Sequence, residues 1–117
     1  DLHNLRSKVA SYFVDAAQGW AHAAGFTQAD ANNRLNVRIW DDYRQSPLAD
    51  ADVRQLAAKI GGLIYCRDDV LQPESLAEYR RLLPGARHHL LTGCAHFPWE
   101  ETPEAYFAVL RRLLADR

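Results

Sequence analysis

The first 58 residues carry their apolar side chains at helical spacing. Over residues 4–18 an apolar residue recurs every three or four positions, so the pattern predicts one amphipathic helix there. Gly19 and Gly25 follow this stretch and weaken any continuation of the helix. We therefore expect an N-terminal helical segment that packs one face against another part of the protein. The apolar face of the predicted helix consists of Leu5, Val9, Tyr12, Phe13 and Ala16.

Two further helices are expected before residue 60. Thr27, with Asp30 three positions later, has the spacing of a capping box, which predicts a helix start. This second helix should run to about Tyr43 and end before Ser46-Pro47, because proline cannot continue a helix. A short third helix is expected over residues 50–59. Its apolar residues Val53, Leu56 and Ala57 should face inward.

The second half of the chain alternates strands and helices. A short apolar run over residues 62–66 and another over 88–92 are typical of buried strands. Helices are expected over residues 73–83 and from Pro103 to Leu114, since proline is favoured at the first position of a helix. The order β-α-β-α predicts an α/β fold with a parallel sheet. Two strands rarely make a stable sheet, so we expect a missing segment or partner chain to supply more.

Composition and charge exclude several classes of protein. The chain has 117 residues, 48% of them hydrophobic and 25% charged, with a formal net charge of −1. These are globular proportions, and the balanced charge favours neither nucleic acid nor an anionic membrane as a partner. No apolar run approaches the ~18 residues of a membrane span. Methionine is absent and the first residue is Asp1, so we expect a fragment or a processed subunit.

The two cysteines, Cys66 and Cys94, are too few for a disulfide scaffold and form no CxxC motif. We expect reduced thiols that act as small buried residues, in a cytoplasmic protein. Both cysteines should lie at the ends of adjacent strands, close to one another, which makes a disulfide between them possible. We keep this disulfide as the less favoured alternative.

Two side chains capable of proton transfer follow the predicted strands. Asp69 lies in the loop after the first strand and His96 in the loop after the second. Neighbouring strands are about 4.8 Å apart, and reactive groups gather at their carboxyl ends, so a hydrogen bond between these two side chains is feasible. Asp68 is the main competitor for the role of the acid. The remaining histidines, His3, His22, His88 and His89, are expected to be structural or surface residues.

At these residues the sequence resembles the C-terminal part of the α/β-hydrolase family, over about residues 56–115. In that family a buried strand ends in Gly-x-x-Asp-x-x-x-Pro, which Cys66, Asp69 and Pro73 match except that cysteine replaces glycine. The family's next strand ends in Gly-x-Gly-His-Phe, and here Ala95 replaces the second glycine. The tail looks closest to proline-iminopeptidase-like hydrolases. The matching residues of this second motif are Gly93, His96, Phe97, Glu101, Pro103 and Glu104.

The resemblance implies two segments in the chain and assigns catalytic roles to Asp69 and His96. Residues 1–58 would be a helical cap-like segment, and residues 59–117 the C-terminal part of the α/β-hydrolase core with two parallel edge strands. His96 would be the general base and Asp69 the acid that orients it. No Gly-x-Ser-x-Gly motif occurs in the chain, so the nucleophile and oxyanion hole would belong to an N-terminal half of the same hydrolase.

The expected activity is hydrolysis of an ester, amide or similar acyl group in a small-molecule substrate. Phe97 and Trp40 are the candidate substrate contacts. No cofactor or metal is expected, since no residues have the spacing of metal ligands. The fold also hosts acyltransferases and epoxide or C–C hydrolases, and a non-catalytic hydrolase-like binding protein is a further alternative. A helical interaction domain that folds alone is the third reading, which the incomplete sheet argues against.

Overall fold

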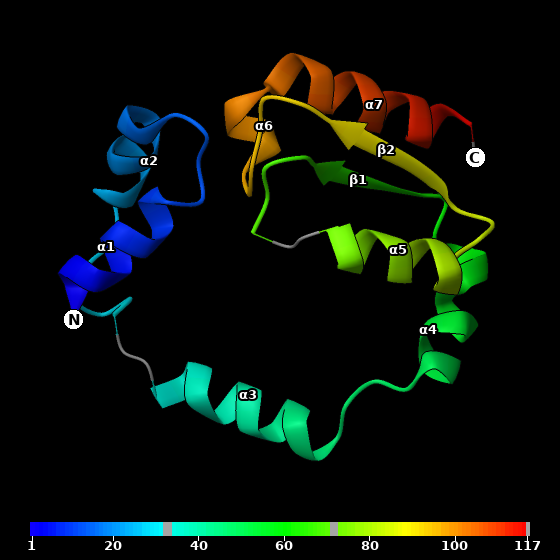
Figure 1. Cartoon of the computed structure of the whole chain (residues 1–117), viewed down its shortest axis with the longest axis horizontal. Helices are drawn as coiled ribbons and strands as arrows, with labels where there is room; N and C mark the ends of the chain where they lie inside the picture. Colours follow the sequence, from blue (N-terminus) through cyan, green and yellow to red (C-terminus); the bar gives the residue numbers. More distant parts are fainter. Residues whose placement is uncertain (32–33, 71–72, 117) are drawn as a thin grey trace.

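The computed structural model describes residues 1–31, 34–70 and 73–116 (Figure 1). It contains helices and a two-stranded parallel sheet, a combination compatible with the α/β class. The first half holds α1 (Leu2–Ala10), α2 (Ala16–Ala23), α3 (Arg34–Gln45), α4 (Asp50–Leu56) and the 3₁₀ turn η1 (Ala57–Lys59). The second half holds β1 (Gly62–Cys66), α5 (Pro73–Leu82), β2 (Arg87–Leu91), α6 (Pro98–Glu101) and α7 (Pro103–Ala115).

The strands β1 and β2 are parallel, as predicted. Their register runs from Gly62 opposite Arg87 to Cys66 opposite Leu91. Successive side chains of a strand point to opposite faces of the sheet. Contacts from oppositely facing positions of β1 therefore show that α5 and α7 cover different faces. Tyr65 of β1 packs against Tyr79 of α5, with ring centroids 6.3 Å apart. On the other face a Cβ at Gly62 would meet the Leu113 side chain of α7, so glycine permits the close approach of that helix.

The predicted single helix over residues 4–18 is wrong, because the chain turns back between α1 and α2. Asp15 starts the second helix by accepting a hydrogen bond from the backbone N–H of Gln18, at 2.7 Å. The reversal packs the two helices against each other, which a straight helix could not achieve. The small core that results consists of Val9, Ala10 and Ala23, with Leu5 and Phe26 packed against it.

Thr27 and Asp30 interact as the sequence predicts, but they close a turn and do not start a helix. The Asp30 carboxylate accepts from the Thr27 backbone N–H at 2.6 Å and from its hydroxyl at 2.8 Å, which lowers the pKa of Asp30. The next helix, α3, begins at Arg34 and ends before Ser46-Pro47 as expected. Residues 32 and 33 lie outside the described part of the chain.

The predicted helix over residues 50–59 forms as α4 followed by η1. Val53 and Ala57 are half-buried, but Leu56 is 52% exposed, so its predicted inward orientation is wrong. Arg81 of α5 links this helix to α4 by donating to Asp50 at 2.6 Å. It also donates to Glu78 of its own helix. These hydrogen bonds lower the pKa values of Asp50 and Glu78. The cluster is exposed, so it contributes little to stability.

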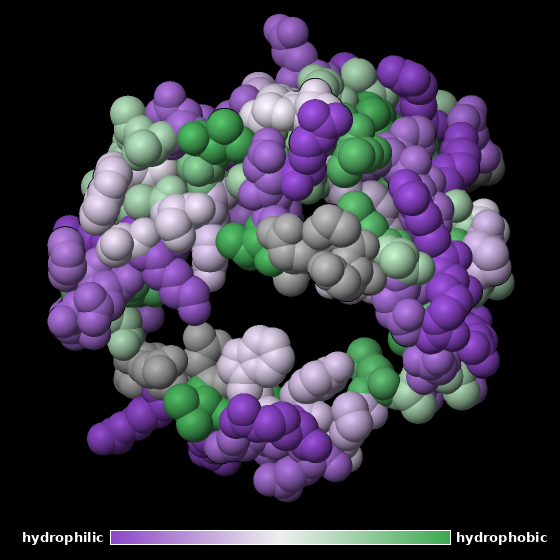
Figure 2. All heavy atoms as spheres, in the orientation of Figure 1, coloured by the Kyte–Doolittle hydropathy of each residue, from purple (hydrophilic) through white to green (hydrophobic). Residues whose placement is uncertain are grey.

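The chain forms an open ring around an uncovered centre (Figures 1 and 2). Its Cα radius of gyration is 16.6 Å, whereas about 13 Å is expected for a compact chain of this length. Helix α3 stands apart from the sheet in Figure 1, and its Trp40 is 58% exposed. Many other large apolar side chains are also exposed, including Val37, Ile39, Leu48, Leu90, Phe107 and Leu114. This much uncovered apolar surface is typical of a protein that binds a partner.

Across the described ranges, no helix combines the length and apolar character needed to span a lipid bilayer.

Gly19 should be required for the packing of α1 on α2. A Cβ at this position would overlap the carbonyl oxygen of Ala10 and lie 3.1 Å from its Cα. We expect Gly19→Ala to lower the free energy of unfolding by about 1–3 kcal/mol, because backbone must move to relieve the overlap. Chemical denaturation measures the change.

Gly25→Ala is the matched control, because its Cβ would meet only the His22 carbonyl oxygen at an ordinary 3.5 Å. This variant should match the wild type to within about 1 kcal/mol. Equal stability of the Gly19 and Gly25 variants would contradict the proposed packing.

Candidate functional site

The loops that follow β1 and β2 run side by side. The backbone N–H of Arg67 donates to the Leu91 carbonyl at 3.0 Å, and that of Asp68 donates to the Cys94 carbonyl at 3.2 Å. These bonds continue the pairing of the two strands beyond their ends. Side chains from the two loops are therefore held within reach of each other.

A disulfide between Cys66 and Cys94 joins the same two loops, so the prediction of reduced thiols is wrong. Cys66 is the last residue of β1, and Cys94 lies in the loop that follows β2. Their Cα atoms are 5.4 Å apart. This separation is typical of a disulfide. Both cysteines are buried, as predicted, and Cys94 is fully so.

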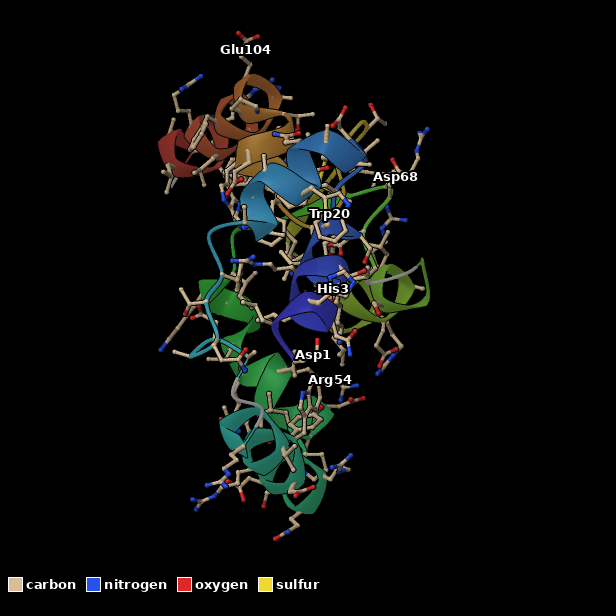
Figure 3. All side chains as sticks on the ribbon, turned by 90° about the vertical axis from the view of Figure 1, so that its left-hand side faces the viewer. Asp1, His3, Trp20, Arg54, Asp68 and Glu104 are labelled. Atoms are coloured by element: carbon tan, nitrogen blue, oxygen red, sulfur yellow. A yellow bond between two sulfur atoms is a disulfide. The ribbon has the colours of Figure 1, made fainter. Side chains whose placement is uncertain are left out.

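Asp69 and His96 meet at the carboxyl ends of the two strands. The Nδ1–H of His96 donates to Oδ1 of Asp69 at 2.9 Å. The Asp69 side chain is 19% exposed and that of His96 is 37% exposed. Because Nδ1 carries the proton that faces the carboxylate, Nε2 of the neutral ring is able to accept a proton. Asp68, the competing acid, is exposed at the surface (Figure 3).

The backbone around His96 is held in place from several directions. Gly93 begins the turn with φ 75°, a left-handed conformation that favours glycine. The His96 backbone N–H donates to the Tyr12 carbonyl at 2.9 Å. The N–H groups of Ala95 and Phe97 both donate to the Glu101 carboxylate, at 2.9 and 3.3 Å. The N-terminal segment therefore contacts the loop that carries the histidine.

Phe97 lies next to the histidine, as the sequence suggests, but its ring is also packed on the N-terminal segment. Its centroid is 5.1 Å from that of His96, with the rings nearly perpendicular. The Phe97 ring also contacts the rings of Phe13 and His22, each with centroids 4.8 Å away. Phe97 thus forms part of a small aromatic cluster beside the Asp69–His96 pair.

His22 and Glu100 form a contact that sequence reasoning missed. The sequence predicts a structural or surface role for His22 and singles out no role for Glu100. In the structure Nδ1 of His22 donates to Oε2 of Glu100 at 2.8 Å, and Gln18 donates to the Glu100 carbonyl at 3.0 Å. The two residues are 78 positions apart, so no local sequence signal could reveal the pairing.

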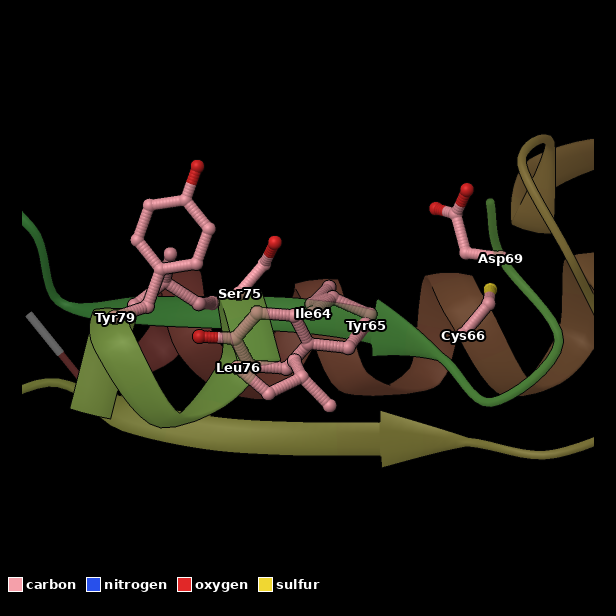
Figure 4. A pocket seen from close by; sticks show the side chains of 8 residues that line it. Ile64, Tyr65, Cys66, Asp69, Ser75, Leu76 and Tyr79 are labelled. Atoms are coloured by element: carbon pink, nitrogen blue, oxygen red, sulfur yellow. The ribbon is translucent and has the colours of Figure 1, made fainter. Parts of the chain in front are cut away.

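Asp69 lies at the junction of two surface pockets. One has a volume of about 260 Å³ and lies between β1 and α5, where Ser75, Leu76 and Tyr79 form its wall (Figure 4). The other has a volume of about 300 Å³ and is lined by Asp69 and His96 together with the apolar surfaces of α6 and α7. The pair shares the lining of this second pocket with Ile64, Cys66, Ala95, Pro98, Trp99 and Tyr106.

Trp40 is not brought to the Asp69–His96 pair. With Ile39 and Tyr43 it forms a separate concave surface on α3. Its assignment as a substrate contact therefore stays a prediction that the observed arrangement of α3 does not support.

The two histidines of β2 are consecutive in the strand, so their side chains point to opposite faces. His88 accepts a hydrogen bond from the Tyr65 hydroxyl at 2.9 Å and donates to the Leu83 carbonyl at 3.2 Å. Burial raises the pKa of Tyr65. Nε2 of His89 is buried and has no hydrogen-bond partner among the residues that the structure describes. In the ranges that the structure covers, no three His, Cys, Asp or Glu side chains are arranged to hold a metal ion.

Comparisons with known proteins give no match: no family model fits the chain, and no curated protein or solved structure is significantly similar to it.

The disulfide should stabilise the two site loops. It encloses a sequence separation of 28 residues, for which chain entropy gives about 3–4 kcal/mol. We expect the double variant Cys66→Ala/Cys94→Ala to lose this much free energy of unfolding, as measured by chemical denaturation.

Dithiothreitol provides the control for that measurement. It should lower the stability of the wild-type chain and leave the double alanine variant unchanged. A wild-type chain whose stability does not respond to the reductant would contradict a structural disulfide.

Proposed function

We propose that this chain supplies the acid and the base of a nucleophile–His–Asp triad in an enzyme of the α/β-hydrolase type, which hydrolyses an ester, amide or similar acyl substrate. The observation that carries the proposal is the 2.9 Å hydrogen bond between Asp69 and His96 at the carboxyl ends of adjacent parallel strands. In α/β sheets this edge is where ligands bind and catalytic groups gather. The sequence motifs around both residues, described above, support the same assignment.

The proposed mechanism assigns one proton path to the pair. Nε2 of His96 takes the proton of the nucleophile as it attacks the acyl carbon, and later donates that proton to the leaving group. The Asp69 carboxylate keeps the other ring proton on Nδ1 and stabilises the imidazolium that forms. The part-buried position of Asp69 strengthens this interaction, because water screens it less.

The nucleophile in this proposal comes from outside the described residues. Within those residues, no serine or threonine hydroxyl bonds to His96. The sulfurs of Cys66 and Cys94 are bonded to each other, so neither serves as a thiolate. The proposed partner is the N-terminal half of the same hydrolase, which carries the nucleophile and the oxyanion hole.

The open structure supports such a partner. The described sheet is a pair of short parallel strands, and parallel sheets are normally covered on both faces and extended by further strands. We propose that the partner adds strands beside β1 and covers exposed apolar side chains of the chain. Residues 1–58 then form the cap-like segment and residues 59–117 the core part, with a small-molecule substrate between the halves.

The compartment remains a prediction, and two expectations about it conflict. The sequence predicts a cytoplasmic protein, whereas the disulfide between Cys66 and Cys94 favours an oxidising compartment, because disulfides are rare in the cytoplasm.

His96 should be essential for the activity. We expect His96→Ala to lower kcat/KM for a simple p-nitrophenyl ester by at least about 10³-fold, because no other group takes the proton of the nucleophile. The assay uses the tagged chain isolated under native conditions with any polypeptide bound to it. Labelling with a fluorophosphonate should mark a serine nucleophile in the wild-type preparation and be lost in the variant.

His3→Ala is the control, because His3 is exposed and stacks on Trp20 at the surface (Figure 3). It should retain activity and labelling. A wild-type preparation without hydrolysis or labelling would favour the non-catalytic binding protein, and hydrolysis without labelling would favour an aspartate nucleophile. Full activity in His96→Ala would rule out the proposed base.

Asp69 and Asp68 offer a direct test of which carboxylate is the acid. Asp69→Asn should lower kcat/KM on the order of 10⁴-fold, because the amide no longer holds the ring proton on Nδ1. Asp68→Asn makes the same chemical change one residue away, at an exposed side chain, and should leave kcat/KM within about 2-fold. The assignment fails if the Asp68 variant shows the larger loss.

A further inference from the structure

Glu101 joins two segments that are far apart in the sequence. One carboxylate oxygen, Oε1, accepts from the backbone N–H of Val14 at 2.7 Å. The other, Oε2, accepts from the backbone N–H groups of Ala95 and Phe97, at 2.9 and 3.3 Å. A single side chain at the end of α6 therefore binds both the N-terminal segment and the loop that carries His96.

The N-terminal segment also binds the residue between those two donors. The His96 backbone N–H donates to the Tyr12 carbonyl at 2.9 Å. The three consecutive N–H groups of Ala95, His96 and Phe97 are thus all bound, alternately by Glu101 and by Tyr12. The Tyr12 ring also lies 5.1 Å from the His96 ring, between centroids. These contacts hold the backbone of His96 in place, and from that position its imidazole ring extends to Asp69.

Only a carboxylate at position 101 can make this set of bonds. Its two oxygens are both acceptors, and each faces N–H groups from a different segment. A glutamine would present one oxygen and one NH₂ group. Whichever way that amide turned, its NH₂ group would face backbone N–H donors, and one of the two segments would lose its acceptor. Hydrogen bonds to a charged acceptor are also stronger than neutral ones.

We propose that Glu101 is a positioning residue, which makes the geometry of the Asp69–His96 pair depend on the docking of residues 12–14. Glu101 touches neither ring nitrogen of His96 in this arrangement, so it acts through the backbone of residues 95–97. The catalytic meaning of the proposal rests on the proposed function, in which His96 is the base. The coupling between the two segments does not rest on it, and it has its own measurements.

Glu101→Gln is the test variant, and Glu104→Gln is the matched control. Glu104 undergoes the same loss of charge three residues away, and its side chain is exposed in the first turn of α7 (Figure 3). Circular dichroism checks that both variants retain the helices of the wild-type chain.

Amide hydrogen exchange and proton NMR on the full chain give readouts that are independent of catalysis. In the wild type, the N–H groups of Val14, Ala95 and Phe97 should exchange at least about 10-fold more slowly than free amides, because each is hydrogen-bonded. Glu101→Gln should remove this protection from Val14 or from the other two. It should also shift or broaden the low-field resonance of the His96 Nδ1–H, a spectroscopic signature that Asp69→Asn identifies by abolishing it.

Kinetics give the second readout. If the natively isolated protein hydrolyses esters, Glu101→Gln should lower kcat about 10- to 100-fold with little change in KM, because a displaced base slows proton transfer more than substrate binding. Glu104→Gln should leave all of these measurements unchanged.

The outcomes separate this proposal from the proposed function. Loss of protection and a changed His96 resonance in Glu101→Gln support the positioning role, even if the wild type proves inactive and the hydrolase proposal fails. An unchanged His96 resonance in a folded Glu101→Gln variant overturns the positioning role, whether or not the protein is a hydrolase. Should the variant fail to fold, fast exchange at Ala95 and Phe97 in the wild type overturns the proposal, and slow exchange at both supports it.

Discussion

The parallel pairing of β1 and β2 is the constraint on which the rest of this structure depends. It places the ends of both strands at the same edge, and the hydrogen bonds from Arg67 to Leu91 and from Asp68 to Cys94 extend the pairing into the loops. The disulfide between Cys66 and Cys94 adds a covalent link at the same level. Without this alignment, the Asp69 carboxylate and the His96 imidazole, which are 27 positions apart in the sequence, would not be held within hydrogen-bond distance.

The second determining feature is the surface that the chain leaves uncovered. A two-stranded parallel sheet exposes polar edges, and the ring-like arrangement of the helices exposes apolar side chains on α3, α4 and α7. Hydrophobic burial is the main favourable contribution to folding, so an arrangement of this kind gains stability from a partner that covers it. The exposed edges of the described two-stranded sheet lead to the same proposal as the lack, among the described residues, of a nucleophile beside His96.

The N-terminal segment connects these two features. Its helices α1 and α2 have a small core of their own, yet the turn between them binds the histidine loop through Tyr12, Val14 and the carboxylate of Glu101. His22 and Glu100 add a second contact between the same parts of the molecule. In the proposed enzyme, the segment that covers the site would therefore also fix the position of its base.

The sequence by itself determined the two strands of the second half, the helices α5 and α7, the parallel sheet and the proximity of Asp69 to His96, because short apolar runs and turn residues are local signals. It did not predict the short helix α6. It did not determine the reversal over residues 11–15, the exposure of Leu56, the disulfide or the contacts of Glu101 and His22. Each of these depends on which distant segments pack together. Periodicity tells which side of a helix is apolar, but only the tertiary structure decides what that side meets.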